Sequence, residues 1–342
     1  MKKLLNVLYL LTSESYLYRQ NETIAVKVGG EDKVRIPSHT IESIICMGNS
    51  TISTPFIGFC GEKGISLSFV SDYGRFLGRI TGPVHGNVLL RKKQFESLSD
   101  KQFCSEIVKY ILTGKIANSK NMLLRSAREH NDEGQAQTLV KAAEKLSNIA
   151  LKLRQDDDVA LLRGYEGIAA NMYYDVFDLM IKVNKDDFYF RGRNRRPPTD
   201  NMNAVLSFLY MLLKNDVQSA LESLGLDPAA GFLHTLRPGR PSLALDMMEE
   251  LRAPLCDRLA LSLINLKQLQ GKDFEETSEG VLMSDKAKKT VISAWQERKK
   301  EEIAHPFLNE KISIGLIPFA QSQLLAKVLR GDLDVYPPFI WR

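Results

Sequence analysis

The chain has 342 residues, of which 44% are hydrophobic and 25% are charged, with 22 Gly and 13 Pro. This length exceeds what a single hydrophobic core usually supports, so two domains are expected. The composition excludes collagen-like, low-complexity and disulfide-framework proteins. The 46 Lys and Arg outnumber the 41 Asp and Glu, and the net charge of +5 permits a polyanionic partner without requiring one.

The start of the chain resembles a secretory signal, because Lys2 and Lys3 precede a mostly apolar run over residues 4–11. Asn6 interrupts that run and no small-x-small cleavage site follows, so a signal peptide is not expected. No apolar stretch of 18 residues occurs, and no membrane span is expected. The four cysteines contain no CxxC pair, which predicts reduced thiols in a cytoplasm.

Residues 1–82 show short alternating segments separated by turn residues such as Gly29-Gly30 and Ser71-Asp72. We predict strands over residues 4–10, 16–18, 23–28, 33–36, 43–46, 66–70 and 76–80, with one helix near 53–62. This stretch is therefore expected to form a small β-rich domain.

Beyond Gly82-Pro83 the pattern changes to long segments with helical periodicity. Residues 83–92 are predicted as a linker and residues 93–342 as an all-helical domain. The predicted helices cover residues 87–115, 117–130, 133–154, 157–182, 200–214, 216–224, 241–271 and 284–304. The expected fold class is α+β, with a β-rich domain followed by a larger helical one.

Glu166 is the first residue that its predicted surroundings do not explain. It shares a helix face with Leu162, Ala169 and Tyr173, which are expected in the core. A buried carboxylate requires a cation, a metal or protonation. A salt bridge to an arginine and a functional role are both open for this residue.

A second feature is the segment from Gly231 to Glu250. Pro241 suits the first turn of a helix, and the acids that follow it share one face opposite an apolar stripe. These acids are Asp246, Glu249, Glu250 and Asp257. His234 precedes them across a turn rich in Pro and Gly. A solvated acidic face is the ordinary interpretation of such a pattern.

The combination of Glu166, His234 and an acidic pair favours a different interpretation. Glutamate, histidine and aspartate are ligands that a divalent cation takes when it keeps positions open for water and phosphate. Such a site would activate an attacking oxygen and stabilise charge on phosphorus, with His234 available for proton transfer. The spacing alone does not establish that these side chains meet.

A third feature is basic and aromatic. Residues 187–198 combine three aromatic side chains with four arginines, which are Arg191, Arg193, Arg195 and Arg196. These residues suit phosphate contacts with some base stacking, and the alternatives are a solvated charge run or subunit contacts. Arg163, Arg237 and Arg240 are expected near the carboxylates, where they would bind phosphates or neutralise the acids.

Taken together, these motifs closely resemble the CRISPR-associated integrase, the metal-dependent DNA endonuclease of spacer acquisition. The matching segments are Leu162-Arg163-Gly164-Tyr165-Glu166-Gly167, residues 194–207, and Gly231-Phe232-Leu233-His234 with residues 242–250. The resemblance covers nearly the whole chain. The pattern is similar to that of type I systems, with subtype C as the finer expectation.

The resemblance implies an N-terminal β domain that builds a homodimer and a helical catalytic domain. It implies that Glu166, His234 and Glu249 hold Mg²⁺ or Mn²⁺, with Asp246 as the neighbouring catalytic acid. Some members carry aspartate at the position of Glu249, which leaves open whether Asp246 or Glu249 is the direct ligand. The expected DNA contacts are Arg163, Tyr165, Arg191, Arg193, Arg195, Arg196, Arg237 and Arg240.

The implied reaction is a transesterification, in which the 3′-hydroxyl of a captured double-stranded fragment attacks a phosphodiester at the edge of a CRISPR repeat. The implied partner is a small dimeric CRISPR-associated protein that bridges two integrase dimers. A plain metal-dependent nuclease or junction resolvase, with water as nucleophile, is the alternative. A non-catalytic helical scaffold that binds nucleic acid is a third hypothesis.

Overall fold

The computed structural model describes residues 5–71, 76–83, 87–194, 197–278 and 280–341. The chain divides into two compact units, residues 1–85 and 86–342. The expected boundary was residue 82, and the predicted linker over 83–92 is too long because a helix begins at Val88. Asn87 caps that helix by accepting a hydrogen bond from the Leu89 N–H.

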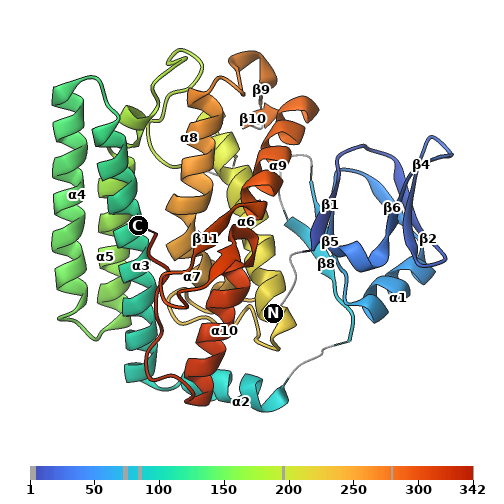
Figure 1. Cartoon of the computed structure of the whole chain (residues 1–342), viewed down its shortest axis with the longest axis horizontal. Coiled ribbons are helices and arrows are strands. Elements are labelled where there is room, and N and C mark those ends of the chain that lie inside the picture. The colour runs from blue at the N-terminus through green and yellow to red at the C-terminus, as the bar shows by residue number, and fades with distance from the viewer. Residues whose placement is uncertain (1–4, 72–75, 84–86, 195–196, 279, 342) are drawn as a thin grey trace. The chain divides into compact units, whose positions relative to one another are not determined.

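The N-terminal unit contains two four-stranded sheets, with strand orders β1-β5-β7-β8 and β4-β3-β2-β6 (Figure 1). The strands are β1 (Asn6–Leu10), β2 (Ser15–Gln20), β3 (Thr23–Val28), β4 (Glu31–Pro37), β5 (Ile41–Met47), β6 (Ser50–Ile52), β7 (Ser66–Val70) and β8 (Phe76–Ile80). β1, β5 and β7 are parallel, whereas β2, β3 and β4 form an antiparallel meander. Both sheets contribute side chains to one core, for example Leu17 and Ile44, which are fully buried.

Helix α1 (Thr54–Lys63) packs into the same core through Phe56 and Phe59. Pro55 lies in its first turn, and the helix ends at Gly64 with φ of 69°, a left-handed conformation that glycine adopts without strain. The predicted β-rich composition of this unit is confirmed. Strand β6 was not predicted, because it has only three residues and follows the turn-forming residues Gly48 and Asn49, although its Ser50 pairs with Ser15 of β2.

The second unit begins with α2 (Val88–Ser97), α3 (Lys101–Arg128), α4 (Glu133–Leu153) and α5 (Val159–Tyr174). Helices α3, α4 and α5 stand side by side (Figure 1). Each of these three begins after an aspartate whose side chain accepts a backbone N–H, namely Asp100, Asp132 and Asp158. The break predicted at residues 115–117 is wrong. Helix α3 begins directly after Asp100 and runs unbroken to Arg128.

Helix α6 (Asn201–Ser223) is also continuous, whereas a break was predicted near residue 215. The helix predicted over 241–271 consists of α7 (Ser242–Leu251), a π-helical segment (Arg252–Asp257) and α8 (Arg258–Asn265). Pro254 lies in the π-helical segment, and proline removes the N–H that a regular α-helical bond requires. π-Helical turns occur often at functional sites.

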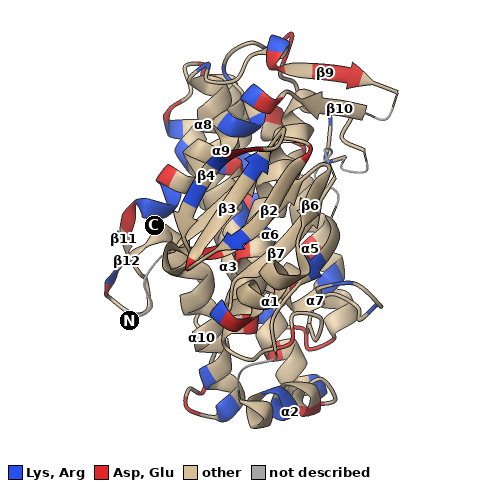
Figure 2. Ribbon diagram, turned by 90° about the vertical axis from the view of Figure 1, so that its right-hand side faces the viewer, with Lys and Arg blue, Asp and Glu red and all other residues tan. Residues whose placement is uncertain are grey.

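The end of the chain contains α9 (Asp285–Lys300) and α10 (Ile317–Arg330), with α10 missing from the prediction. Two short hairpins, β9 (Phe274–Thr277) with β10 (Gly280–Met283) and β11 (Glu302–Ala304) with β12 (Lys311–Ser313), were also missed. These strands are too short to produce a clear alternating pattern. β9 carries Glu275 and Glu276 (red in Figure 2), whereas α2 carries three consecutive cations (blue).

The expected α+β fold class, with a β-rich domain followed by a helical one, is confirmed. Within the described ranges, no helix is both long and apolar enough to cross a bilayer.

Candidate metal centre and nucleic-acid site

The loop that carries His234 is held against the start of α7 by the carboxylate of Asp246. One oxygen, Oδ2, accepts the backbone N–H groups of Phe232 and Leu233 at 2.6 and 2.9 Å. The other, Oδ1, accepts the His234 N–H at 2.9 Å and lies 2.6 Å from His234 Nδ1. Asp246 is fully buried, so its role in the fold is to fix the loop and the imidazole.

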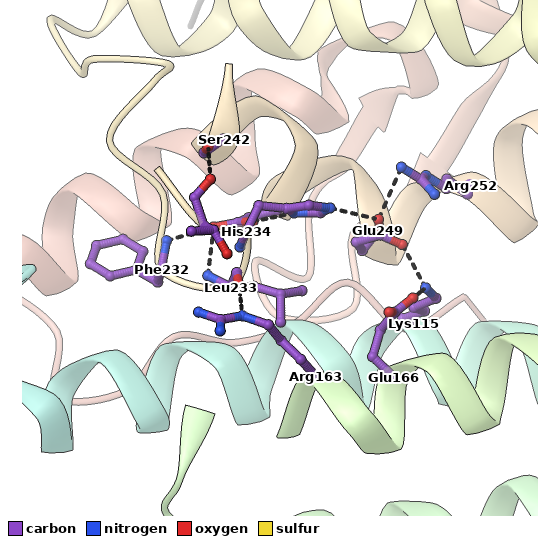
Figure 3. Close-up of polar contacts among 11 residues, drawn as sticks. Lys115, Arg163, Glu166, Phe232, Leu233, His234, Ser242, Glu249 and Arg252 are labelled. Atoms are coloured by element: carbon purple, nitrogen blue, oxygen red, sulfur yellow. Dashed lines mark hydrogen bonds and ion pairs between the residues drawn. The ribbon is translucent and has the colours of Figure 1, made fainter. Parts of the chain in front are cut away.

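Gly231 makes this arrangement possible. A Cβ atom at this position would lie 2.6 Å from the backbone of Ser242 and 2.7 Å from Asp246 Oδ2, which no side chain tolerates. The loop therefore passes against the first turn of α7, with His234 Nδ1 directed at Asp246 (Figure 3). Nδ1 is thus engaged by Asp246, which leaves Nε2 as the ring nitrogen directed away from this acid.

The Nε2 edge of the ring faces Glu249, one turn along α7 from Asp246. His234 Nε2 lies 4.0 Å from Glu249 Oε1, and Arg252 NH2 approaches the same oxygen at 2.9 Å. The other oxygen, Oε2, lies 2.8 Å from Lys115 Nζ of α3. Lys115 also forms an ion pair with Glu166 Oε1 of α5. Helices α3, α5 and α7 and the loop that carries His234 thus meet at one centre, as Figure 3 shows.

Glu249 is ionised despite being only 3% exposed. Burial alone would raise the pKa of its carboxyl, but the charges of Arg252 and Lys115 outweigh burial and hold the pKa at about 2. Glu166 is more accessible, with 29% of its side chain exposed. The centre therefore combines a permanent buried negative charge with a second carboxylate that solvent reaches.

The donor set of this centre suits a hard divalent cation. Glu166 and Glu249 both pair with the Lys115 ammonium, and the His234 imidazole lies beside Glu249, so oxygen and nitrogen ligands of the kind that bind divalent cations are gathered here. Glu249 Oε2 is buried and makes no regular hydrogen bond to any described residue. In the described chain no three acidic, histidine or cysteine side chains are already arranged as a coordinating group, and Lys115 pairs with both carboxylates.

The opposite side of α7 carries Glu250, which is fully buried among neutral partners. Its oxygens accept hydrogen bonds from Tyr336 Oη, Gln321 Nε2 and the Phe339 N–H. Burial raises the pKa of Glu250 to about 7, against the effect of these hydrogen bonds. We call residues 331–341 the tail strap, because this segment crosses the back of α7 and ends against α3.

The tail strap is fixed to α3 by two amide side chains, Asn118 and Asn121, the second of which donates from Nδ2 to the Trp341 carbonyl at 2.7 Å. Asn118 Nδ2 donates to the carbonyls of Glu250 and Phe339, and its Oδ1 accepts the Trp341 N–H. A Cβ atom at Gly114 would lie 3.0 Å from both Glu250 and Pro338, so glycine allows α3, α7 and the tail strap to meet closely. Lys115, the next residue, is thereby brought to the side of α7 that carries Glu249.

Asp257, at the end of the π-helical segment, is buried and accepts hydrogen bonds from Tyr210 and Tyr173 at 2.6 and 3.0 Å. Burial raises its pKa to about 6. The guanidinium groups of Arg252 and Arg193 lie 5.1 and 5.2 Å from the centre of the Tyr210 ring. A continuous set of contacts therefore links Glu249 to the loop after α5.

These positions overturn the interpretation of a solvated acidic face. Asp246, Glu249, Glu250 and Asp257 are all at most 3% exposed, and each has specific partners. Gly164 and Gly167, on either side of Glu166 in the sequence, do not stand at a close contact within the described chain. A Cβ at either glycine would meet no described atom within 4 Å.

Some of the residues predicted to contact nucleic acid are exposed in loops, and others make hydrogen bonds within the chain. Arg191, Arg237 and Arg240 lie in loops, with Arg191 and Arg237 exposed. Arg163 is exposed but donates from Nε to the Leu233 carbonyl, which ties α5 to the His234 loop. The Tyr165 hydroxyl donates to Asp156 at 2.6 Å. DNA binding by these residues stays a prediction.

Arg193 is engaged within the chain. It donates to Asn203 Oδ1 and Ser207 Oγ at 2.7 and 3.0 Å, in addition to its position against Tyr210. These contacts anchor the basic loop to α6. Arg195 and Arg196 lie outside the described residues.

Three residues of the centre were absent from the predicted site. Arg252 follows Glu249 by one helical turn, a spacing from which an ion pair could have been predicted. Lys115 and Asn118 come from α3, far away in the sequence, and carried no signal that places them against α7.

Comparison with known proteins places these features in a wider context. A family profile described as "CRISPR associated protein Cas1" matches residues 8–297. The chain is 48% identical over 347 residues to a CRISPR-associated endonuclease Cas1 of Rhodospirillum rubrum, with 100% of each chain covered. A solved CAS1 protein from Thermotoga maritima superposes with a TM-score of 0.83 at 26% identity, over 96% of this chain and 97% of that one.

Two solved structures of lower identity share the fold. A Cas6-RT-Cas1–Cas2 complex contains a chain with a TM-score of 0.85 at 21% identity, covering 100% of this chain and 36% of that one. A casposase bound to integration product gives a TM-score of 0.84 at 20% identity, over 99% of this chain and 95% of that one.

Proposed function

The chain belongs to the Cas1 family of CRISPR-associated endonucleases, and from this premise we propose that it inserts captured DNA fragments as new spacers at a CRISPR repeat. The proposed reaction is attack of a fragment 3′-hydroxyl on a phosphodiester at the repeat edge. The observation that carries the proposal is the convergence of Glu166, His234 and Glu249 from α5, a loop and α7.

The proposed ligands of Mg²⁺ or Mn²⁺ are Glu166, His234 and Glu249. When bound, such a cation supplies Lewis-acid stabilisation of the charge that develops on the phosphate. Between Asp246 and Glu249, the contacts favour Glu249 as the third ligand, because every Asp246 contact described above is directed at the His234 loop. Asp246 then acts behind the ligand, holding the imidazole with Nε2 toward the metal.

The remaining residues align the reacting strands and balance charge. Each joining step exchanges one phosphodiester for another, so no high-energy cofactor is needed and the work is positioning and charge stabilisation. Arg252, fixed between Glu249 and the Tyr210 ring, keeps the buried carboxylate ionised. The exposed Arg163, Arg191 and Arg237 are proposed to contact DNA phosphates.

The proposal extends to the assembly. We assign homodimer formation to the N-terminal unit, and bridging of two dimers to a small dimeric CRISPR-associated protein, in line with the Cas1–Cas2 complex among the structural neighbours. A cytoplasmic location is supported by the four cysteines, all buried as free thiols. The type I, subtype C assignment rests on the motif pattern of residues 162–167, 194–207 and 231–250.

The alternative is a nuclease or junction resolvase that uses water at the same centre. An integration assay separates the two. Labelled duplex with free 3′-hydroxyls, supercoiled plasmid carrying the repeat, Mg²⁺ or Mn²⁺ and the small partner are mixed with wild type or His234→Ala. Label joined to plasmid by wild type alone supports integration; nicking without joining supports the nuclease, and DNA binding without chemistry contradicts both.

A further inference from the structure

Lys115 occupies the space that separates the two proposed carboxylate ligands. Its ammonium contacts Glu249 Oε2 at 2.8 Å and also pairs with Glu166 Oε1, so it joins α5 to α7. Only 12% of its side chain is exposed. No part of the proposed reaction described above uses this lysine.

We propose that Lys115 is a built-in counter-cation that a divalent metal must displace. This inference rests on the proposed metal centre and adds to it a control of metal affinity. Without metal, the lysine neutralises two carboxylates that would otherwise repel each other in a partly buried space. With metal, the same oxygens turn to the doubly charged ion and the ammonium withdraws.

The contacts distinguish Lys115 from Arg252, the other cation at the centre. Arg252 touches only one oxygen of Glu249 and is fixed against the Tyr210 ring, so a metal between the carboxylates does not meet it. Lys115 bridges both carboxylates on a flexible four-carbon stem, which lets its ammonium move without moving α3.

The position is built into the backbone. Gly114 lets α3 pass close to α7, because a Cβ at this position would lie 3.0 Å from Glu250. Asn118 ties the next turn of α3 to the Glu250 carbonyl. The stem of Lys115 therefore starts from a fixed point while its charged end remains free to exchange partners. A competitor of this kind makes the protein bind metal more weakly than its donor set would allow.

The test measures Mn²⁺ binding to the purified full chain without DNA, by the loss of the free Mn²⁺ EPR signal. Lys115→Gln is expected to lower the Kd for Mn²⁺ about tenfold, equal to about 1.4 kcal/mol. In EDTA the same variant is expected to melt several degrees below wild type, because its carboxylates lose their counter-ion. Excess Mn²⁺ is expected to remove most of that difference.

Lys109→Gln is the matched control, because Lys109 is on the same helix and also pairs with one carboxylate, that of Asp157. It is expected to leave the Kd for Mn²⁺ unchanged. Lys115→Met is a second neutral variant that keeps the apolar stem, and Lys115→Arg keeps the charge and is expected to gain no affinity.

The inference is overturned if both neutral variants bind Mn²⁺ as weakly as wild type or more weakly, since the lysine would then be a structural partner only. Failure of the proposed function has a different signature. In that case Lys115→Gln still binds Mn²⁺ more tightly, but wild type never joins labelled DNA to the plasmid. Joining by wild type without any change of Kd in the variants leaves the proposed function intact and removes the role of Lys115.

Discussion

Two neighbouring residues of α7, Glu249 and Glu250, are both buried carboxyls and yet have opposite electrostatic properties. On the side that carries the proposed metal ligand, called the ligand side below, Glu249 meets the cations Lys115 and Arg252, which hold its pKa at about 2. On the other side, Glu250 meets only neutral donors of α10 and the tail strap, and its pKa is raised to about 7.

The difference shows that burial does not decide what a carboxyl does. The desolvation penalty acts on both groups, and the nature of the partners determines whether the charge survives. Cations on the ligand side preserve the negative charge that the proposed metal site requires. On the side of the tail strap, Glu250 has only hydrogen bonds from neutral donors, so it holds α7 in place and is only about half ionised near pH 7.

The largest expected effect separates the two residues by activity. Glu249→Gln removes the ionised ligand and is expected to reduce joining of labelled DNA on the order of 10³-fold, comparable to losing one main stabilising group of an active site. Glu250→Gln keeps the ligand side intact and is expected to stay within about tenfold of wild type. Equal losses in the integration assay would remove the functional distinction between the two sides.

The second expected effect concerns stability against pH. Because the folded pKa of Glu250 is raised from 4.5 to about 7, the folded state binds more protons than the unfolded chain between these values. The free energy of unfolding is therefore expected to fall as pH rises from about 4.5 to 7, by on the order of 3 kcal/mol.

Glu250→Gln is expected to flatten this dependence, which urea unfolding at pH 5, 6 and 7 would measure. Asp257, whose pKa is raised to about 6, supplies the slope that remains. Glu249 behaves oppositely, because its lowered pKa gives stability that is lost only as pH falls below about 4.5 toward 2. Parallel curves for wild type and variant would count against a neutral Glu250.

The third expected effect lies behind the ligand side. Asp246→Asn leaves one oxygen where two accept four contacts, so the His234 loop loses hydrogen bonds. Joining activity and Mn²⁺ affinity are expected to fall about 10- to 100-fold, as for other groups that orient a metal ligand. Asp156→Asn, which alters an acid bonded to Tyr165, is the control and is expected to leave Mn²⁺ affinity unchanged.

The smallest expected effect is on the strap side. Tyr336→Phe removes one donor from Glu250 while Gln321 and the Phe339 N–H remain. The free energy of unfolding is expected to fall by about 1–2 kcal/mol, with the joining rate unchanged well below the melting temperature. Tyr189→Phe serves as the control in denaturant unfolding. A large loss of joining rate in Tyr336→Phe would mean that the strap side also takes part in the chemistry.

Much of the fold follows from local signals in the sequence. The strand alternation of residues 1–82 and the helix starts predicted at residues 133 and 157 are properties of short segments, and the structure places these starts at Glu133 and Val159. The continuity of α3 and α6 and the existence of α10 were not predicted, because tertiary packing decides where long helical patterns break.

The residues of the candidate site also include some that the sequence predicted and some that it did not. Glu166, His234, Asp246 and Glu249 were singled out because their residue types and motifs carry chemistry. Lys115 and the partners of Glu250 were not, because a lysine on a long helix ordinarily faces solvent, and residues 331–341 have no pattern that predicts a contact with α7. Such contacts join segments far apart in the sequence, and only the folded chain reveals them.

The tail strap also imposes an order on the synthesis of the protein. Glu250 and Phe339 are separated by 89 residues, so a ribosome working at roughly 5–20 residues per second makes α7 roughly 5–20 s before the strap that satisfies it. Throughout that interval the nascent chain carries Glu250 without its Phe339 and Tyr336 partners. The contacts that hold α7 against the tail strap are consequently completed only after residues 336–339 have been made.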